Sequence, residues 1–285
     1  MGIRTDLAVE AHEIKSREAA KRIDGVTAHK EEKNGITLTR VAITKKSASE
    51  LLNKAEGTYI TIETPGLRYG AEECEAASEI IAEEISKMAD ITADTTTLVA
   101  GLGNRDITPD ALGCAVVSDI FITNHLSSGI KNALGKNISN VCAVAPGVLG
   151  TTGMETSEII KGITEKVKPQ LVIAVDALAA ADIRRVNTTI QIADTGIQPG
   201  AGVGNNRRGL NEETLGVKVI AIGVPTVIDA ETVCGAEIPD DIAPLIVTTK
   251  DIDVVIERMA KTVAAGIIMA LQPDLSFEEI ESCIR

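Results

Sequence analysis

Short apolar runs alternate along the chain with longer stretches in which apolar residues recur at helical spacing. The strand-like runs are Ile36–Thr44, Thr58–Glu63, Thr96–Ala100, Val141–Ala145, Leu171–Val175, Thr188–Ala193 and Lys218–Gly223. The helix-like stretches are Ala71–Met88, Pro109–Ile122, Glu155–Val167 and Asp251–Leu271. Strands that alternate with helices are typical of parallel βαβ units. The pattern therefore predicts an α/β fold, a three-layer sandwich around a mostly parallel sheet.

Nothing in the pattern divides the chain. It contains no internal repeat, low-complexity tract or Pro/Ser-rich linker, and we expect one domain spanning residues 1–285. The first thirty-five residues are polar and charged, and we expect them to be peripheral. Thr108 and Pro109 are suited to the N-cap and the first position of the helix that follows them.

Composition limits the choice of partners. Aromatic residues make up only 1% of the 285 residues, so an aliphatic core is expected, and the formal net charge is −13. A nucleic-acid surface usually needs clustered basic residues and stacking aromatics, and anionic membranes also attract basic faces. We therefore expect neither partner. The acidity either only keeps the protein soluble or attracts a basic or polar polypeptide.

The five cysteines are scattered and never form a Cys-x-x-Cys pair. This spacing fits reduced thiols in a cytosol and argues against a disulfide framework or a cysteine-rich zinc site. We expect no metal and no other cofactor. The sequence has neither a basic-then-apolar leader nor an apolar run long enough to span a membrane, so a cytoplasmic protein is expected.

Two strand ends carry candidate chemistry, because sites in open parallel sheets form at the carboxyl ends of strands. After the first, a Gly101-x-Gly103 loop leads through Asn104, Arg105 and Asp106 to Asp110. Asp110 either stabilises the first turn of a helix or belongs to a site. The glycines could also cradle a phosphate, although the rest of the nucleotide-binding fingerprints is absent.

Asp176 directly follows the most apolar strand, Leu171–Val175. A buried carboxylate needs a partner or a raised pKa, unless Asp176 only caps the next helix. If Asp110 and Asp176 share a cleft, one of them holds a proton, and the pair can act as base and acid on one water. The alternative use of such a pair is as oxygen ligands for a metal.

The remaining candidates are weaker. His125 is the one histidine outside the N-terminal segment, and a lone histidine near a helix end more often packs than catalyses. Two basic doublets, Arg184-Arg185 and Arg207-Arg208, either contact an acidic peptide or pair with surface carboxylates. The second doublet lies in a glycine-rich loop that we interpret as a flap or a backbone-lined groove.

Three segments of the sequence resemble the germination protease family, peptidases that degrade small acid-soluble spore proteins. Residues 3–12 resemble the self-cleavage region, residues 101–113 the first catalytic loop, and residues 171–207 the second catalytic loop with the segment after it. The resemblance extends, with gaps, through most of the chain. Its long matching runs make it far more specific than the short motifs.

The resemblance implies a phosphorylase/hydrolase-like α/β fold related to hydrogenase maturation peptidases, a homotetramer, and a zymogen in the developing spore. It implies that Asp110 and Asp176 are the catalytic pair, with residues 103–106 as a supporting loop. It also implies self-cleavage between Asp6 and Leu7, which would make residues 1–6 a short propeptide. The sequence Asp6-Leu-Ala-Val-Glu10 has the acid, apolar, Ala, any, Glu pattern of the family's substrates.

Two other hypotheses remain open. A metal-dependent maturation peptidase of the same fold would need a histidine beside the carboxylates, and His125 is the only suitable donor in the sequence. In a non-catalytic homologue, Asp110 and Asp176 would be purely structural.

Overall fold

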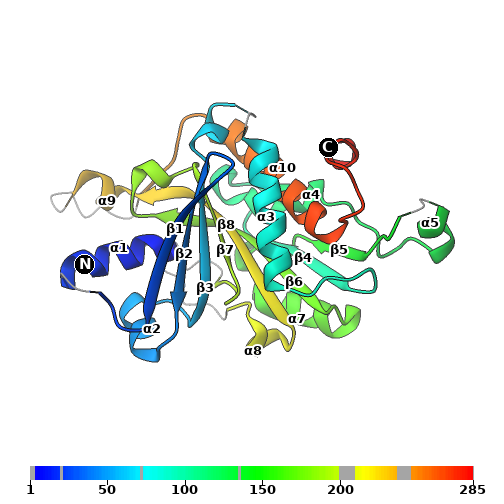
Figure 1. Cartoon of the computed structure of the whole chain (residues 1–285), viewed down its shortest axis with the longest axis horizontal. Coiled ribbons are helices and arrows are strands. Elements are labelled where there is room, and N and C mark those ends of the chain that lie inside the picture. Colours follow the sequence, from blue (N-terminus) through cyan, green and yellow to red (C-terminus); the bar gives the residue numbers. More distant parts are fainter. Residues whose placement is uncertain are drawn as a thin grey trace.

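One twisted sheet runs through the molecule (Figure 1). The computed structural model describes residues 4–19, 22–70, 73–133, 136–198, 209–235 and 245–284. Within these residues nine strands are hydrogen-bonded in the order β1-β2-β3-β7-β8-β6-β4-β5, with β9 beside β8. The strands are β1 (Val26–Lys33), β2 (Ile36–Ile43), β3 (Gly57–Glu63), β4 (Thr96–Gly101), β5 (Asn140–Val144), β6 (Leu171–Ala180), β7 (Thr189–Ala193), β8 (Lys218–Asp229) and β9 (Ile246–Val247).

The α/β class is confirmed, but the sheet is mixed rather than mostly parallel. Strands β5, β4, β6 and β8 are parallel, whereas β7, β3, β2 and β1 continue the sheet in antiparallel pairs. The pattern of apolar residues gives the position of a strand but not its direction. Asn34-Gly35, both with positive φ, form the hairpin turn between β1 and β2, and this dipeptide is a signal that could have predicted an antiparallel pair.

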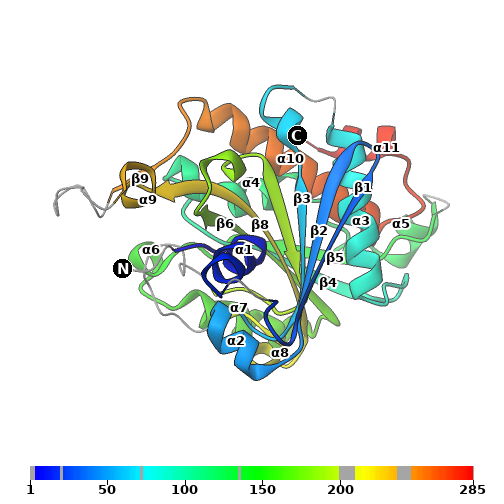
Figure 2. The ribbon, with the colours of Figure 1, turned by 60° about the vertical axis from the view of Figure 1, so that its left-hand side comes forward.

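Helices cover both faces of the sheet (Figures 1 and 2). One face carries α3 (Cys74–Met88), α4 (Leu112–Asp119) and α10 (Ile252–Leu271), with α11 (Phe277–Cys283) packed on α10. The other face carries α1 (Ala8–Ala19) and α2 (Lys46–Leu52) over β2 and β3, and α7 (Thr156–Val167) and α8 (Glu212–Leu215) near β4, β6 and β8. The three-layer arrangement is therefore as predicted.

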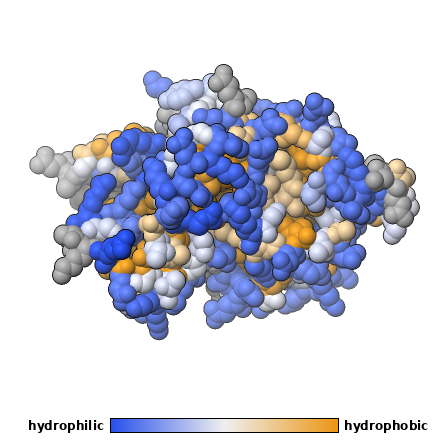
Figure 3. Space-filling model, in the orientation of Figure 1, coloured by the Kyte–Doolittle hydropathy of each residue, from blue (hydrophilic) through white to orange (hydrophobic). Residues whose placement is uncertain are grey.

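The shorter elements lie at the ends of these layers. They are the helices α5 (Ser128–Ala133), α6 (Leu149–Thr152) and α9 (Ala230–Cys234) and the single 3-10 turns η1 (Pro65–Arg68), η2 (Thr108–Asp110) and η3 (Ile183–Arg185). Among the described helices, none is long and apolar enough to cross a lipid bilayer. The face of the molecule shown in Figure 3 is largely hydrophilic, in keeping with the charge of the chain.

Part of the N-terminal segment is buried, contrary to the prediction, whereas β1 is an exposed edge strand. The side chains of Leu7 and Ala8 have 0% exposure, and Val9 and Ala11 are also buried in a cluster with residues of β2, β3, β6 and β7. This apolar stretch is short and is followed by many charged residues, which is why the composition of the whole segment hides it. Helix α1 thus belongs to the core of its layer.

The core on the α3–α10 face depends on a close approach of these two helices. A Cβ atom added to Gly266 on α10 would lie 2.7 Å from Ile81 Cβ and 3.0 Å from Ser78 O on α3. Such a contact forces the neighbouring atoms to move, and a close-packed interior resists that movement. The glycine therefore sets the spacing between the two helices.

This spacing can be tested with Gly266→Ala. Alanine normally stabilises a helix relative to glycine, but here overpacking should lower the free energy of unfolding by about 1 kcal/mol or more in urea titrations. The matched control is Gly162→Ala on the exposed face of α7, where an added Cβ meets nothing within 4 Å. The control should gain about 0.5–1 kcal/mol. Equal stabilisation of both variants would contradict the proposed role of Gly266.

Candidate active site

Asp176 lies inside β6, near the middle of the sheet. Its exposure is 5%, and its Oδ1 accepts a hydrogen bond of 3.0 Å from the N–H of Ala177. The sequence predicted that the strand would end at Val175, but β6 continues to Ala180. The neighbouring strand β4 does end there, because Gly101 is its last residue and pairs with Val175. Asp176 therefore occupies the first position of β6 beyond β4.

Asp110 is positioned by the loop that leaves β4. Gly103 has a φ of +95°, and a Cβ there would lie 2.0 Å from the carbonyl oxygen of Asp110, so the loop closes tightly. The N–H of Asn104 donates to Asp110 Oδ2 at 2.7 Å. Thr226 Oγ1 on β8 donates to the carbonyl of Pro109 at 2.6 Å. These contacts fix the carboxylate of Asp110 relative to β4 and β8.

The predicted helix start differs in detail. Pro109 and Asp110 lie in the 3-10 turn η2, and α4 begins only at Leu112, without a side-chain N-cap. Thr108 is therefore not the N-cap of α4. Of the predicted supporting residues, Gly103 and Asn104 shape the loop, Arg105 is exposed, and Asp106 donates its N–H to Asn104 Oδ1 at 3.0 Å.

The loop that carries Asp110 packs against the strand that carries Asp176. A Cβ added to Gly113, at the start of α4, would lie 2.5 Å from the carbonyl oxygen of Val175. Leu102 N–H also donates to that oxygen at 2.7 Å. Burial raises the pKa of Asp176 well above its usual value, and the negative charge of Asp110 raises it further. Both effects favour the protonated form of Asp176.

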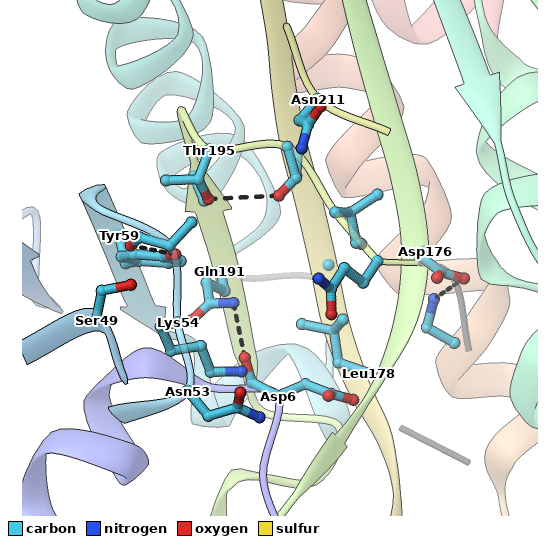
Figure 4. Close-up of a pocket in the computed structure, with 18 of the residues that line it drawn as sticks. Asp6, Ser49, Asn53, Lys54, Tyr59, Asp176, Leu178, Gln191, Thr195 and Asn211 are labelled. Atoms are coloured by element: carbon cyan, nitrogen blue, oxygen red, sulfur yellow. Dashed lines mark hydrogen bonds between the residues drawn. The ribbon is translucent and has the colours of Figure 1, made fainter. Parts of the chain in front are cut away.

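A cleft of about 390 Å³ opens beside Asp176 (Figure 4). Its wall is formed by residues of β6, β7 and β8, including Asp176, Leu178 and Gln191. The end of α2 contributes Lys54 to the rim, and the N-terminal segment contributes Asp6. Among its described lining residues the cleft includes Asp176 but not Asp110.

The N-terminal segment lies in this cleft. The N–H of Asp6 donates to Ala179 O at 2.9 Å, and Asp6 Oδ2 accepts from the N–H of Ala179 at 2.8 Å. The side chain of Gln191 binds on both sides of Leu7. Its Nε2 donates to the Asp6 carbonyl at 3.2 Å, and its Oε1 accepts from the N–H of Ala8 at 2.8 Å. Four hydrogen bonds thus fix Asp6 and the two peptide groups that follow it.

Glu10 anchors the first turn of α1. Its side chain is 2% exposed and accepts from the N–H groups of Ala181 at 2.6 Å and Asp182 at 3.0 Å, and from the hydroxyl of Thr5. Burial raises the pKa of Glu10, although these hydrogen bonds and the nearby charge of Arg185 oppose the shift. The carboxyl group therefore links α1 to the end of β6.

The basic residues predicted to contact substrate have other partners. Arg185, 13% exposed, binds both carboxylate oxygens of Glu13 at 2.7 and 2.9 Å and lies 3.7 Å from Glu10. Arg184, 83% exposed, pairs with its own neighbour Asp182. Arg207 lies outside the described residues. Arg185 therefore holds α1 in place.

The sequence analysis missed Lys54 and Gln191. Gln191 had a usable signal, because it is a polar residue in the middle of an apolar strand. Lys54 had none, since it follows a short helix in a polar context. His125, considered as a metal ligand, is exposed in the loop between α4 and α5. Within the described ranges, no group of three or more His, Cys, Asp and Glu side chains could hold a metal ion.

Comparisons with known proteins show the family of the chain. A family model described as germination protease matches residues 4–243. The chain belongs to the germination protease family. It is 42% identical to the germination protease of Clostridium tetani over 100% of both chains. It is 48% identical to that of Geobacillus sp. over 81% of this chain and 65% of the relative. The expected resemblance is thereby confirmed, and with it the expectation that the chain is a peptidase.

One solved structure is also similar, a [NiFe] hydrogenase maturation protease HycI from Thermococcus kodakarensis. It is 22% identical and covers 61% of this chain and 92% of its own, with a TM-score of 0.35.

The raised pKa of Asp176 predicts how stability depends on pH. A carboxyl group whose pKa is higher in the folded state stabilises the fold at low pH. This contribution is lost as the pH rises from the unfolded-state pKa to the folded-state pKa, and a tenfold higher proton affinity in the folded state is worth about 1.4 kcal/mol. The free energy of unfolding of the wild type should therefore decline over that range, and the decline should be smaller in Asp176→Asn.

Urea titrations from pH 4 to 9 measure both declines. The exposed Asp90→Asn is the control and should follow the wild type. An identical decline in Asp176→Asn would contradict a raised pKa of Asp176 in the folded state.

Arg184 and Arg185 have different surroundings, so we expect their replacement by alanine to lower the free energy of unfolding by different amounts. Arg185→Ala leaves Glu13 without its bidentate partner and removes the cation 3.7 Å from Glu10, and should lower the free energy of unfolding by about 1–3 kcal/mol. Arg184→Ala removes an exposed pair and should leave the free energy of unfolding nearly unchanged. Urea titrations compare the two, and hydrogen exchange should show faster exchange in α1 for Arg185→Ala alone. Equal costs would show that Arg185 does not anchor α1.

Proposed function

We propose that the chain is an aspartic-type endopeptidase in which Asp110 and Asp176 activate a water molecule. The observation that carries the proposal is the position of Asp176, which lies buried at the wall of a cleft, where burial and the charge of Asp110 raise its pKa. Two interacting carboxyl groups that share one proton supply a base and an acid at the same place.

In this mechanism the ionised member of the pair takes a proton from water as the water attacks the carbonyl carbon of the peptide. The protonated member donates to the carbonyl oxygen, which gives a neutral tetrahedral intermediate. The base then returns its proton to the leaving nitrogen, the C–N bond breaks, and the hydroxyl of the intermediate re-protonates the acid. The pair ends in its starting state, and one water has been consumed.

The same cleft supports a proposal for self-processing at the Asp6–Leu7 bond, with residues 1–6 as the propeptide. The described arrangement is a latent one. Asp6 is bonded at Ala179, which lies three residues along β6 from Asp176, about 10 Å at the rise of a strand. The carbonyl of Leu7 accepts from the N–H of Ala11 at 3.1 Å, in the first turn of α1. For processing, this turn must open and the segment must move along β6.

The family membership supports the finer parts of the proposal. The substrates are small acid-soluble spore proteins, degraded at germination, and the enzyme acts as a homotetramer in the developing spore compartment. Substrate sequences share the acid, apolar, Ala, any, Glu pattern of residues 6–10.

The test is cleavage by Asp110→Asn and Asp176→Asn variants. Each should lower the rate of cleavage of a Glu-Ile-Ala-Ser-Glu peptide by at least about 100-fold, the contribution expected of a general acid or base. Each should also leave the N-terminus of the chain at residue 1, as read by N-terminal sequencing after incubation. The fold should survive, as checked by circular dichroism.

The exposed Asp90→Asn serves as the control and should keep both activities. Full activity in either catalytic variant would end the proposal. Loss of activity on addition of a chelator would favour a metal-dependent peptidase instead.

A further inference from the structure

A row of residues crosses the sheet at the level of Asp176, on the face that α1 covers (Figure 2). Asp176 on β6 pairs with Gly223 on β8, which in turn pairs with Gln191 on β7. Gln191 pairs with Thr61 on β3. Paired residues of neighbouring strands point to the same face of a sheet. We call this row, together with Thr189, which lies two residues before Gln191 on the same face of β7, the sheet floor.

The sheet floor carries two buried hydroxyl groups that α1 does not satisfy. Thr61 and Thr189 are at most 1% exposed, and among the described residues neither Oγ1 atom has a hydrogen-bond partner. On the helix side, Ser16 Oγ of α1 is also buried without a partner in the described part of the chain. A buried polar group that is left unpaired is costly and rare in proteins. Helix α1 therefore covers the sheet floor without matching its polar groups.

The remaining parts of the sheet floor are suited to a peptide main chain. Gln191 already binds main-chain groups on both sides of Leu7, one as donor and one as acceptor. Gly223, which lines the cleft beside Asp176, adds no side chain. Amide and hydroxyl side chains both donate and accept, so they can bind the C=O and N–H groups of an extended chain whatever its side chains are.

The sheet floor also has the length that the proposed substrate requires. Thr61 lies three strands from Asp176, which is about 14 Å at the usual spacing of strands. Four positions of the pattern in residues 6–10 follow the bond that is cut. Four extended residues span about 13 Å. A peptide cut beside Asp176 can therefore reach Gln191 and Thr61 with the residues that follow the bond.

We infer that the sheet floor binds the main chain of the substrate beyond the cut bond, and that α1 excludes the substrate by covering this site. The inference rests on the proposed function and deepens it by naming the substrate-binding surface. Leu7 and Ala8 are buried against this face, so a substrate binds only after the first turn of α1 has moved away. The hydroxyl groups of Thr61 and Thr189 then find partners in the peptide.

Arg185 controls how easily α1 moves. Its guanidinium binds Glu13 of α1 at 2.7 and 2.9 Å and lies 3.7 Å from Glu10. A ligand that binds only the open form has an apparent affinity that is reduced in proportion to the open fraction. Loss of the Arg185 contacts raises that fraction, so it should strengthen peptide binding by the same factor.

Peptide binding to the full chain tests this competition. The probe is a fluorescently labelled Glu-Ile-Ala-Ser-Glu peptide in which a hydroxyethylene group replaces the Glu–Ile peptide bond, so that it cannot be cut. Arg185→Ala should tighten its binding in fluorescence polarisation about tenfold and speed hydrogen exchange of the Ala8 amide by the same factor. Arg184→Ala, which removes only an exposed pair, should change neither. Faster exchange without tighter binding would overturn the inference.

The hydroxyl groups are tested with Thr61→Val and Thr189→Val, which keep the shape of the side chain. Neither hydroxyl has a partner beneath α1 among the described residues, so exchange of the Ala8 amide should stay the same or become slower. Binding of the same peptide should weaken about tenfold, and by more than exchange slows, because each change removes a hydrogen bond to the peptide.

The matched control is Thr97→Val. Thr97 on β4 is also fully buried without a partner among the described residues, but it lies outside the sheet floor. This variant should bind the peptide as the wild type does. Unchanged binding in both Thr61→Val and Thr189→Val would overturn the inference. Because the probe cannot be cut, this failure is distinct from failure of Asp110 and Asp176 as catalysts.

Discussion

The structure depends on the burial of one carboxyl group in the middle of a sheet. Asp176 interrupts a strand that is otherwise aliphatic, at the position where the neighbouring strand has ended. Beyond that position β4 leaves an edge of β6 uncovered, which is an opening in the sheet, and the cleft lies beside Asp176 over β6, β7 and β8. The loop from β4 to α4 closes the opening from one side with the aid of Gly103 and Gly113, because neither position has room for a Cβ atom. A neutral Asp176 is stable in this place, whereas an ionised one is costly. The fold therefore favours a carboxyl group at position 176 that can donate a proton.

The same opening explains why the N-terminal segment docks where it does. Residues 5–10 supply hydrogen-bonding groups to Ala179, Ala181 and Asp182, at the end of β6. Leu7 and Ala8 bring the apolar surface that fills the cluster under α1. Polar and apolar contacts thus reinforce each other over a few residues. The strand that carries Asp176 also holds the N-terminal segment. Docking of this segment and the surroundings of Asp176 are therefore coupled.

Much of the fold was predictable from local pattern, and the failures have physical reasons. The seven predicted strands are present because aliphatic runs of this kind can be satisfied only in a covered sheet. Strand β1 was missed because it is an edge strand with charged, exposed side chains, and it is defined by its pairing with β2. The antiparallel half of the sheet was missed for a related reason, since strand direction is a property of connections. The burial of α1 was hidden by averaging over a highly charged segment.

The sequence predicted those residues of the candidate site whose immediate sequence neighbours make them unusual. Asp176 was recognisable because a carboxylate after an apolar strand is improbable without a partner, and Asp110 because it ends a glycine-containing loop. Gln191 and Arg185 acquire their roles from residues more than 170 positions away, and Lys54 from Thr5, 49 positions away. No local pattern carries that information. Arg184 and Arg185 make the point most directly, because adjacent residues of one type differ completely in burial and partners.

The complete burial of Leu7 has one more consequence. Hydrolysis of the bond before it would convert an amide nitrogen into an α-ammonium group at a site with 0% side-chain exposure, beside an apolar cluster. A positive charge is poorly tolerated there, and the ammonium of Lys54 lies close by on the same rim of the cleft. The new chain end would be repelled from the place where it was formed. After cleavage the two new chain ends could not return to the positions that they held before the bond was cut.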